Sequence, residues 1–87
     1  MITIISKGYC PYCASAKQLI SGLGFEYKEI DVTIDSETLQ KASEFSGMRT
    51  VPQVFAGEMS KESSLWGFDD ISALHDAGKL VALLEEA

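Results

Sequence analysis

Positive charge is scarce in this chain: seven lysines and arginines stand against 13 acidic residues, and the formal net charge is −6. Nucleic-acid binding needs clustered cations that neutralise phosphates, so this composition argues against a DNA- or RNA-binding protein. The chain lacks any run of about 18 apolar residues, and residues 1–5 have neither the length nor the basic flank of a secretory signal. We therefore expect a cytoplasmic protein that binds neither nucleic acid nor membrane.

Metal-ligating residue types are also few. His75 is the only histidine, and Cys10 and Cys13 are the only cysteines. A structural zinc site usually takes four such ligands, so we expect no metal site. A disulfide between cysteines three positions apart closes too small a loop to restrict the unfolded chain, which argues against a stabilising crosslink. The two thiols are therefore expected to perform chemistry.

The first third of the sequence predicts a βαβ unit. Residues 2–6 are mostly β-branched and apolar, which is typical of a buried strand, and the helix that follows begins at Pro11 and ends at the glycines at 22 and 24. Residues 25–32 alternate between apolar and polar and form a second strand. A right-handed crossover places this strand parallel to the first.

The rest of the chain completes a single α/β domain over residues 1–87. A helix capped by Asp35 or Ser36 ends at Gly47, and its inward face comprises Leu39, Ala42 and Phe45. The pattern then predicts a short strand at 53–56, a weak antiparallel strand at 58–60 and a polar loop at 61–64. The last helix begins near Asp69 or Asp70 and breaks at Gly78.

The two cysteines stand at the start of the first helix. Positions i and i+3 share one helix face, so Cys10 and Cys13 can approach closely enough to form a disulfide. The first turn exposes unpaired backbone N–H groups and the positive end of the helix dipole, which stabilise a thiolate at Cys10, and Lys7 adds positive charge. The pattern predicts redox exchange between dithiol and disulfide.

Three blocks of the sequence resemble the dithiol glutaredoxins, which are small oxidoreductases with the thioredoxin fold. The blocks are CPYC at 10–13, SGMRTVPQVF at 46–55 and GFDD at 67–70, in the family's order. The resemblance spans nearly the whole chain and implies a βαβ unit followed by a ββα unit, with a mixed four-stranded sheet flanked by helices. It also implies glutathione as co-substrate with no permanently bound cofactor, and we expect a monomer.

The resemblance further implies roles for individual residues. Cys10 matches the nucleophile that takes up glutathione as a mixed disulfide, and Cys13 matches the resolving thiol. The implied glutathione contacts are Lys7, Tyr12, Arg49, Thr50, Val51, Pro52, Gly67, Phe68, Asp69 and Asp70.

Each of these contacts has an implied partner on glutathione. Lys7 and Arg49 meet the glycyl carboxylate, and Val51, before a cis peptide bond to Pro52, pairs with the tripeptide like an added strand. The corner at 67–69 receives the γ-glutamyl end, with Asp69 facing its ammonium group. Asp70 has a competing role as a helix cap.

Trp66 departs from the family pattern, because it stands where a glycine is usual. A tryptophan there would shield the groove or offer an apolar contact to a reductase. The segment SSLWGF resembles the glutaredoxin-like redoxins, which reduce ribonucleotide reductase and draw electrons from thioredoxin reductase.

Three functions follow from the resemblance. The first is glutathione-dependent reduction of protein disulfides and glutathionylated proteins, with ribonucleotide reductase as one candidate partner. The second is a redoxin reduced by thioredoxin reductase. The third is an iron–sulfur carrier in which two protomers share a cluster, and we rank it lowest because Pro11 in a dithiol motif argues against it.

Overall fold

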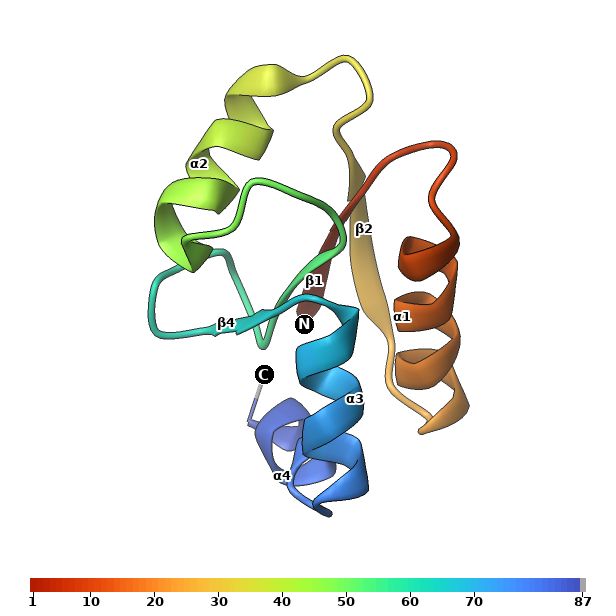
Figure 1. Cartoon of the computed structure of the whole chain (residues 1–87). Coiled ribbons are helices and arrows are strands. Elements are labelled where there is room, and N and C mark those ends of the chain that lie inside the picture. Colours follow the sequence, from red (N-terminus) through yellow and green to blue (C-terminus); the bar gives the residue numbers. More distant parts are fainter. Residues whose placement is uncertain (87) are drawn as a thin grey trace.

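The computed structural model describes residues 1–86 and confirms the α/β class (Figure 1). No helix within these residues is long and apolar enough to cross a membrane. The elements are β1 (Ile2–Ser6), α1 (Pro11–Gly22), β2 (Tyr27–Asp31), α2 (Ser36–Ser46), β3 (Gln53–Phe55), β4 (Ser64–Trp66), α3 (Phe68–Asp76) and α4 (Leu80–Glu85).

The four strands form one mixed sheet in the order β2-β1-β3-β4. Strand β1 runs parallel to β2, with Ile2 opposite Tyr27, and antiparallel to β3, which in turn pairs antiparallel with β4. The predicted βαβ unit and mixed four-stranded sheet are therefore confirmed.

Alternate residues of β1 supply the two faces of the core. Ile2 and Ile4 pack with buried residues of α1, α3 and α4, whereas Ile5 packs with Ala42 of α2 and Phe55 of β3. Helices α1 and α3 thus cover one face of the sheet and α2 covers the other (Figure 1). This packing from both sides holds the carboxyl end of β1, which leads into the cysteine motif.

Helix α2 begins and ends as its sequence predicts but turns a different side chain inward. Asp35 caps it by accepting a hydrogen bond from the Thr38 N–H at 3.0 Å, and Gly47 ends it with a φ of 77°. Phe45 is 37% exposed, so its predicted core position is wrong. Ser46, four positions after Ala42, is buried instead, and its hydroxyl donates to Gln53 Oε1 at 2.8 Å.

The fourth strand lies later in the chain than its pattern predicts. Residues 58–60 are not a strand, and Ser64, expected in the loop, begins β4. The side chains of Ser60 and Ser63 close the intervening loop, since each hydroxyl accepts a hydrogen bond from the other residue's N–H at 3.1 Å. After this loop, β4 pairs with β3 and buries Leu65, which is 7% exposed.

The predicted break at Gly78 is confirmed. Gly78 adopts a φ of 73° between α3 and α4, a left-handed conformation that glycine adopts without steric cost. The chain can therefore turn and bury Leu80 and Leu84 of α4 against the same core as Ile71 of α3.

A buried serine and a lysine meet one carboxylate on the α1 side of the sheet. The Ser6 hydroxyl donates to Glu29 Oε2 at 2.6 Å, and Lys17 Nζ donates to the same oxygen at 3.0 Å. The hydrogen bond from Ser6, followed by that from Lys17, lowers the pKa of Glu29 below its ordinary value of 4.5. The ion pair between Lys17 and Glu29 ties α1 to β2.

Replacing Glu29 should give a pH-dependent loss of stability. A carboxyl group whose pKa is lower in the folded protein than in the unfolded chain stabilises the fold at pH values above its unfolded-state pKa. This contribution is lost as the pH falls through the folded-state pKa. Glu29→Gln should therefore be less stable at pH 7, by less than about 1 kcal/mol because the Glu29 side chain is 37% exposed. The difference in urea-unfolding free energy should shrink below pH 4.5. A difference that stays constant with pH would contradict this.

Candidate active site

The two cysteines lie at the amino end of α1 and form a disulfide. Cys10 is the N-cap residue with extended backbone, and Pro11 begins the helix, where its missing N–H removes no helical hydrogen bond. The Cα atoms of Cys10 and Cys13 are 5.1 Å apart. The expected disulfide between positions i and i+3 is therefore confirmed.

The two sulfurs differ in exposure and in hydrogen bonding. Cys10 is partly exposed, whereas Cys13 is 1% exposed. The backbone N–H of Cys13 donates to Cys10 Sγ at 3.1 Å. Because a hydrogen bond to a charged acceptor favours the charged form, this contact stabilises a thiolate on Cys10 once the disulfide is reduced. Cys10 is thus the sulfur that an incoming molecule can reach.

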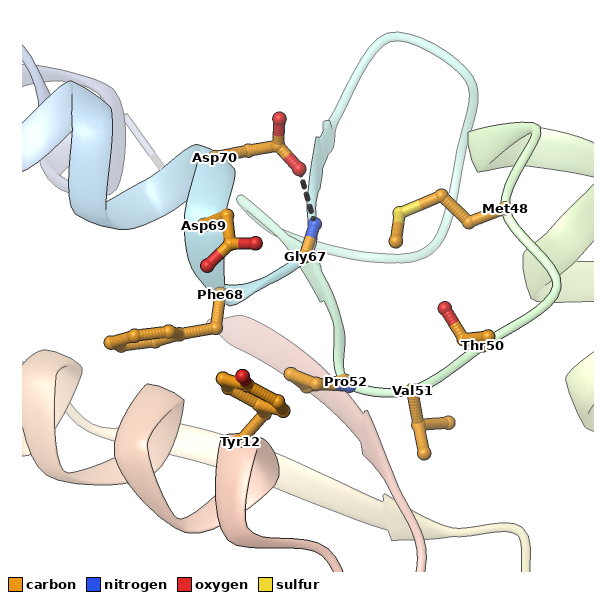
Figure 2. Close-up of a pocket in the computed structure, with 9 residues that line it drawn as sticks. All are labelled: Tyr12, Met48, Thr50, Val51, Pro52, Gly67, Phe68, Asp69 and Asp70. Carbon is orange, nitrogen blue, oxygen red and sulfur yellow. Dashed lines mark hydrogen bonds between the residues drawn. The ribbon is translucent and has the colours of Figure 1, made fainter.

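A pocket of about 200 Å³ lies beside the motif (Figure 2). Three segments form it: the first turn of α1, the loop of residues 47–52 and the start of α3. The lining residues are Tyr12, Met48, Thr50, Val51, Pro52, Gly67, Phe68, Asp69 and Asp70. Eight of the ten predicted contacts are therefore brought together, from parts of the chain more than 50 residues apart.

The other two predicted contacts lie outside this lining. Lys7 and Arg49 are exposed, Lys7 on the loop before Cys10 and Arg49 between two residues of the pocket wall. Met48 is a lining residue that sequence reasoning missed, because a methionine in an irregular segment is most often packing. Its position two residues before Thr50 in the TVP block was the available signal.

Two aromatic rings form one side of the pocket. Tyr12 of α1 and Phe68 of α3 have ring centroids 6.2 Å apart and planes inclined at 34°. Figure 2 shows both rings at the same end of the pocket, below the α3 carboxylates. Tyr12 keeps 62% of its surface exposed, so this wall presents an apolar face to any molecule that reaches Cys10.

Close packing explains the glycine at position 67. A Cβ atom there would lie 3.0 Å from Met48 Cε and 3.5 Å from the Pro52 carbonyl oxygen, so a side chain would press on the pocket wall. The Gly67 N–H donates to Asp70 Oδ2 at 3.0 Å. Of the two roles predicted for Asp70, helix capping is the one the structure displays, and the carboxylate also lines the pocket. The predicted cis peptide bond between Val51 and Pro52 is present.

Comparison of the sequence and fold with known proteins shows to which family the chain belongs. The family model for glutaredoxins matches residues 2–60, well over half of the chain. The chain belongs to the glutaredoxin family. A glutaredoxin of Vernicia fordii is 43% identical over 89 residues, covering 99% of this chain and 82% of that protein. Glutaredoxin-C4, chloroplastic, of Oryza sativa subsp. japonica is 44% identical over 89 residues, covering 99% and 64% respectively.

A solved glutaredoxin structure shares the fold. The crystal structure of the buckwheat glutaredoxin–glutathione complex superposes with a TM-score of 0.83 at 33% identity, covering 98% of this chain and 76% of that one. The predicted glutaredoxin fold is therefore confirmed. Family membership together with the Cys10–Cys13 pair makes this chain a thiol–disulfide oxidoreductase.

Trp66 occupies its position in a glycine-like conformation. Its φ of 63° lies in the left-handed region, which disfavours any residue with a Cβ atom and which a glycine would adopt without steric cost. A register shift puts one extra residue on β4, with Val54 opposite Trp66 and Phe55 opposite Ser64. Trp66 is 47% exposed and lies outside the pocket lining, so of its two expected roles the position of the ring supports an apolar contact to a partner better than shielding of the groove.

A matched pair of variants should measure the strain at this position of the glutaredoxin. Trp66→Gly and Trp66→Ala both remove the indole, but only glycine relieves the positive φ. We expect Trp66→Gly to be more stable than Trp66→Ala by about 1 kcal/mol, the reverse of the usual order within a strand. Urea unfolding of the two variants measures the difference. An alanine variant as stable as the glycine variant would show that the backbone relaxes.

Proposed function

We propose that this glutaredoxin is a glutathione-dependent oxidoreductase that reduces protein disulfides and glutathionylated proteins. The observation that carries the proposal is the pocket beside Cys10, which is lined by eight residues that the family resemblance assigns to glutathione. The buckwheat relative, which shares the fold, was solved in complex with glutathione.

The charges around the pocket support this substrate. Glutathione carries two carboxylates and one ammonium group. Asp69 is exposed at the start of α3, where it suits the ammonium, and the unpaired N–H groups of that helix end suit the adjacent carboxylate. Lys7 and Arg49 supply local positive charge for the glycyl carboxylate in a protein whose net charge is −6.

The proposed reaction is a sequence of thiol–disulfide exchanges. The Cys10 thiolate attacks one sulfur of the substrate, and the other sulfur leaves as a thiolate that takes up a proton. With a protein disulfide, the Cys13 thiolate then attacks Cys10 Sγ, which forms the Cys10–Cys13 disulfide and releases the substrate as a dithiol. Two glutathione molecules reduce that disulfide and leave as glutathione disulfide, so two electrons pass from glutathione to the substrate.

With a glutathionylated protein, a shorter cycle suffices. Cys10 takes up the glutathionyl group and releases the protein thiol. A second glutathione then attacks the mixed disulfide on Cys10 and leaves as glutathione disulfide. Cys13 takes no part in this cycle, which gives the two cysteines separable roles.

The source of electrons decides between this proposal and the redoxin alternative, which Trp66 favours. One disulfide substrate should be turned over with two coupled systems, glutathione with glutathione reductase and thioredoxin reductase alone. We expect turnover with glutathione and little with thioredoxin reductase. The opposite result would overturn the proposal in favour of the redoxin. Ribonucleotide reductase serves as one protein substrate in both systems. The cytoplasmic location stays a prediction, since the relatives include a chloroplastic protein.

A further inference from the structure

One polar side chain is buried directly behind the pocket. Gln53, the first residue of β3, is 0% exposed, and an amide in such a position is costly unless it is hydrogen-bonded. Its Oε1 accepts from the Ser46 hydroxyl at 2.8 Å, and its Nε2 donates to the Thr50 carbonyl at 3.1 Å. Longer contacts of 3.4 Å join Nε2 to the Met48 carbonyl and to Ser43 Oγ. Gln53 therefore spans from α2 to the loop of residues 47–52.

That loop supplies four lining residues of the pocket without being part of a helix or strand. Its backbone is anchored through Gln53 and through Ser46, which accepts a hydrogen bond from the Met48 N–H at 3.0 Å while donating to Gln53. Both anchoring side chains are buried, so water does not compete for these bonds. The position of Met48 and Thr50 relative to the opposite wall thus depends on the Gln53 amide and on the Ser46 hydroxyl that is bonded to it.

We propose that Gln53 is a positioning residue that sets the affinity for glutathione from behind the pocket. It lies outside the lining and acts through the carbonyl groups of Met48 and Thr50. When the amide is removed, these carbonyls lose their donor and the loop settles differently against Gly67. The inference rests on the proposed glutathione use and adds a determinant of it to the pocket residues.

The test replaces Gln53 with methionine, which has a similar length and no hydrogen-bonding amide. With glutathione as reductant and a protein disulfide as substrate, glutathione must itself enter the pocket to reduce the Cys10–Cys13 disulfide, so KM for glutathione should rise about three- to tenfold, the effect of one or two lost hydrogen bonds, while kcat changes less than about twofold. With dithiothreitol in place of glutathione, reduction of a protein disulfide should proceed at the wild-type rate. The alkylation rate of Cys10 by iodoacetamide should also be unchanged.

The matched control is Thr3→Val, which removes a buried hydrogen bond elsewhere in the same sheet. Thr3 is 6% exposed and its hydroxyl donates to the Gly57 carbonyl at 2.7 Å, beyond the opposite end of β3 from Pro52. It should lose stability and keep the wild-type KM for glutathione. If Gln53→Met fails to fold, Ser46→Ala removes the same anchor from its other end and should raise KM in the same way.

The experiment distinguishes failure of the proposed glutathione use from failure of the proposed role of Gln53. If the wild type does not turn over with glutathione, the proposed function is wrong. If the wild type uses glutathione and the Gln53 and Ser46 variants keep the KM of Thr3→Val, the pocket is right and the positioning role is wrong. A parallel fall of the glutathione and dithiothreitol activities would likewise overturn it, since that pattern reports general damage.

Discussion

Cys10→Ser is expected to abolish every thiol–disulfide reaction of this protein, whereas Cys13→Ser should abolish only one of the two. Cys10 is the partly exposed sulfur, and the Cys13 N–H contact at 3.1 Å favours its thiolate. A serine there removes the atom that accepts the glutathionyl group or attacks the protein disulfide, so both cycles stop at their first step.

Cys13 is needed only where a mixed disulfide between Cys10 and a protein substrate must be broken by a second thiol of the same chain. Cys13 is 1% exposed and adjoins Cys10, which suits attack within the protein and not on an outside molecule. Cys13→Ser should therefore keep the removal of glutathionyl groups, lose most of its rate on an intramolecular protein disulfide, and accumulate a covalent complex with that substrate.

The measurement assays both single variants on a glutathionylated peptide and on a protein disulfide, with mass spectrometry to detect trapped adducts. Full activity of Cys10→Ser on either substrate would show that the nucleophile is misassigned. Equal losses on both substrates in Cys13→Ser would show that Cys13 is not a resolving thiol.

Asp69→Ala should raise KM for glutathione by roughly 10- to 150-fold, which corresponds to about 1.5 to 3 kcal/mol for a hydrogen bond to a charged group. The carboxylate is exposed at the pocket and is proposed to meet the γ-glutamyl ammonium. The alkylation rate of Cys10 should hardly change, because Asp69 acts on the substrate and not on the thiolate.

The control for Asp69 is Asp76→Ala, which removes the same charge from the other end of α3. Asp76 is exposed, is the last residue of α3, which begins at Phe68, and lies outside the pocket lining. It should leave KM for glutathione unchanged. A similar rise in both variants would attribute the effect to net charge, and a change in Cys10 alkylation without a change in KM would contradict the assignment.

The parts of the fold that local chemistry decides were predictable from the sequence. Pro11 and the glycines near residue 22 bound α1, Asp35 and Gly47 bound α2, and Gly78 separates the last two helices. The pocket was predictable for a different reason, since the CPYC, TVP and GFDD blocks resemble a family whose three segments meet. Their convergence could not be derived from spacing alone.

The errors occur where partners distant in sequence decide the outcome. The strand expected at 58–60 is absent because a loop closed by Ser60 and Ser63 takes up that stretch, and only pairing with β3 selects Ser64–Trp66 as β4. Phe45 is expected in the core because it is an apolar residue on a helix. The face of α2 that packs on the sheet instead carries Ser46, which bonds to Gln53, and leaves Phe45 exposed. A buried hydrogen bond between two polar residues leaves little trace in a hydrophobic pattern.

The half-exposed indole at position 66 also gives the protein an optical reporter. Trp66 is the only tryptophan of the chain, is 47% exposed, and adjoins Gly67 of the pocket wall. Indole emission depends on the polarity around the ring and on nearby quenching groups, so the whole tryptophan signal of the protein originates at the edge of its active site. Occupation of the pocket is therefore expected to change the intrinsic fluorescence of the unlabelled, unmutated chain, which can be recorded in the same cuvette as the redox assay.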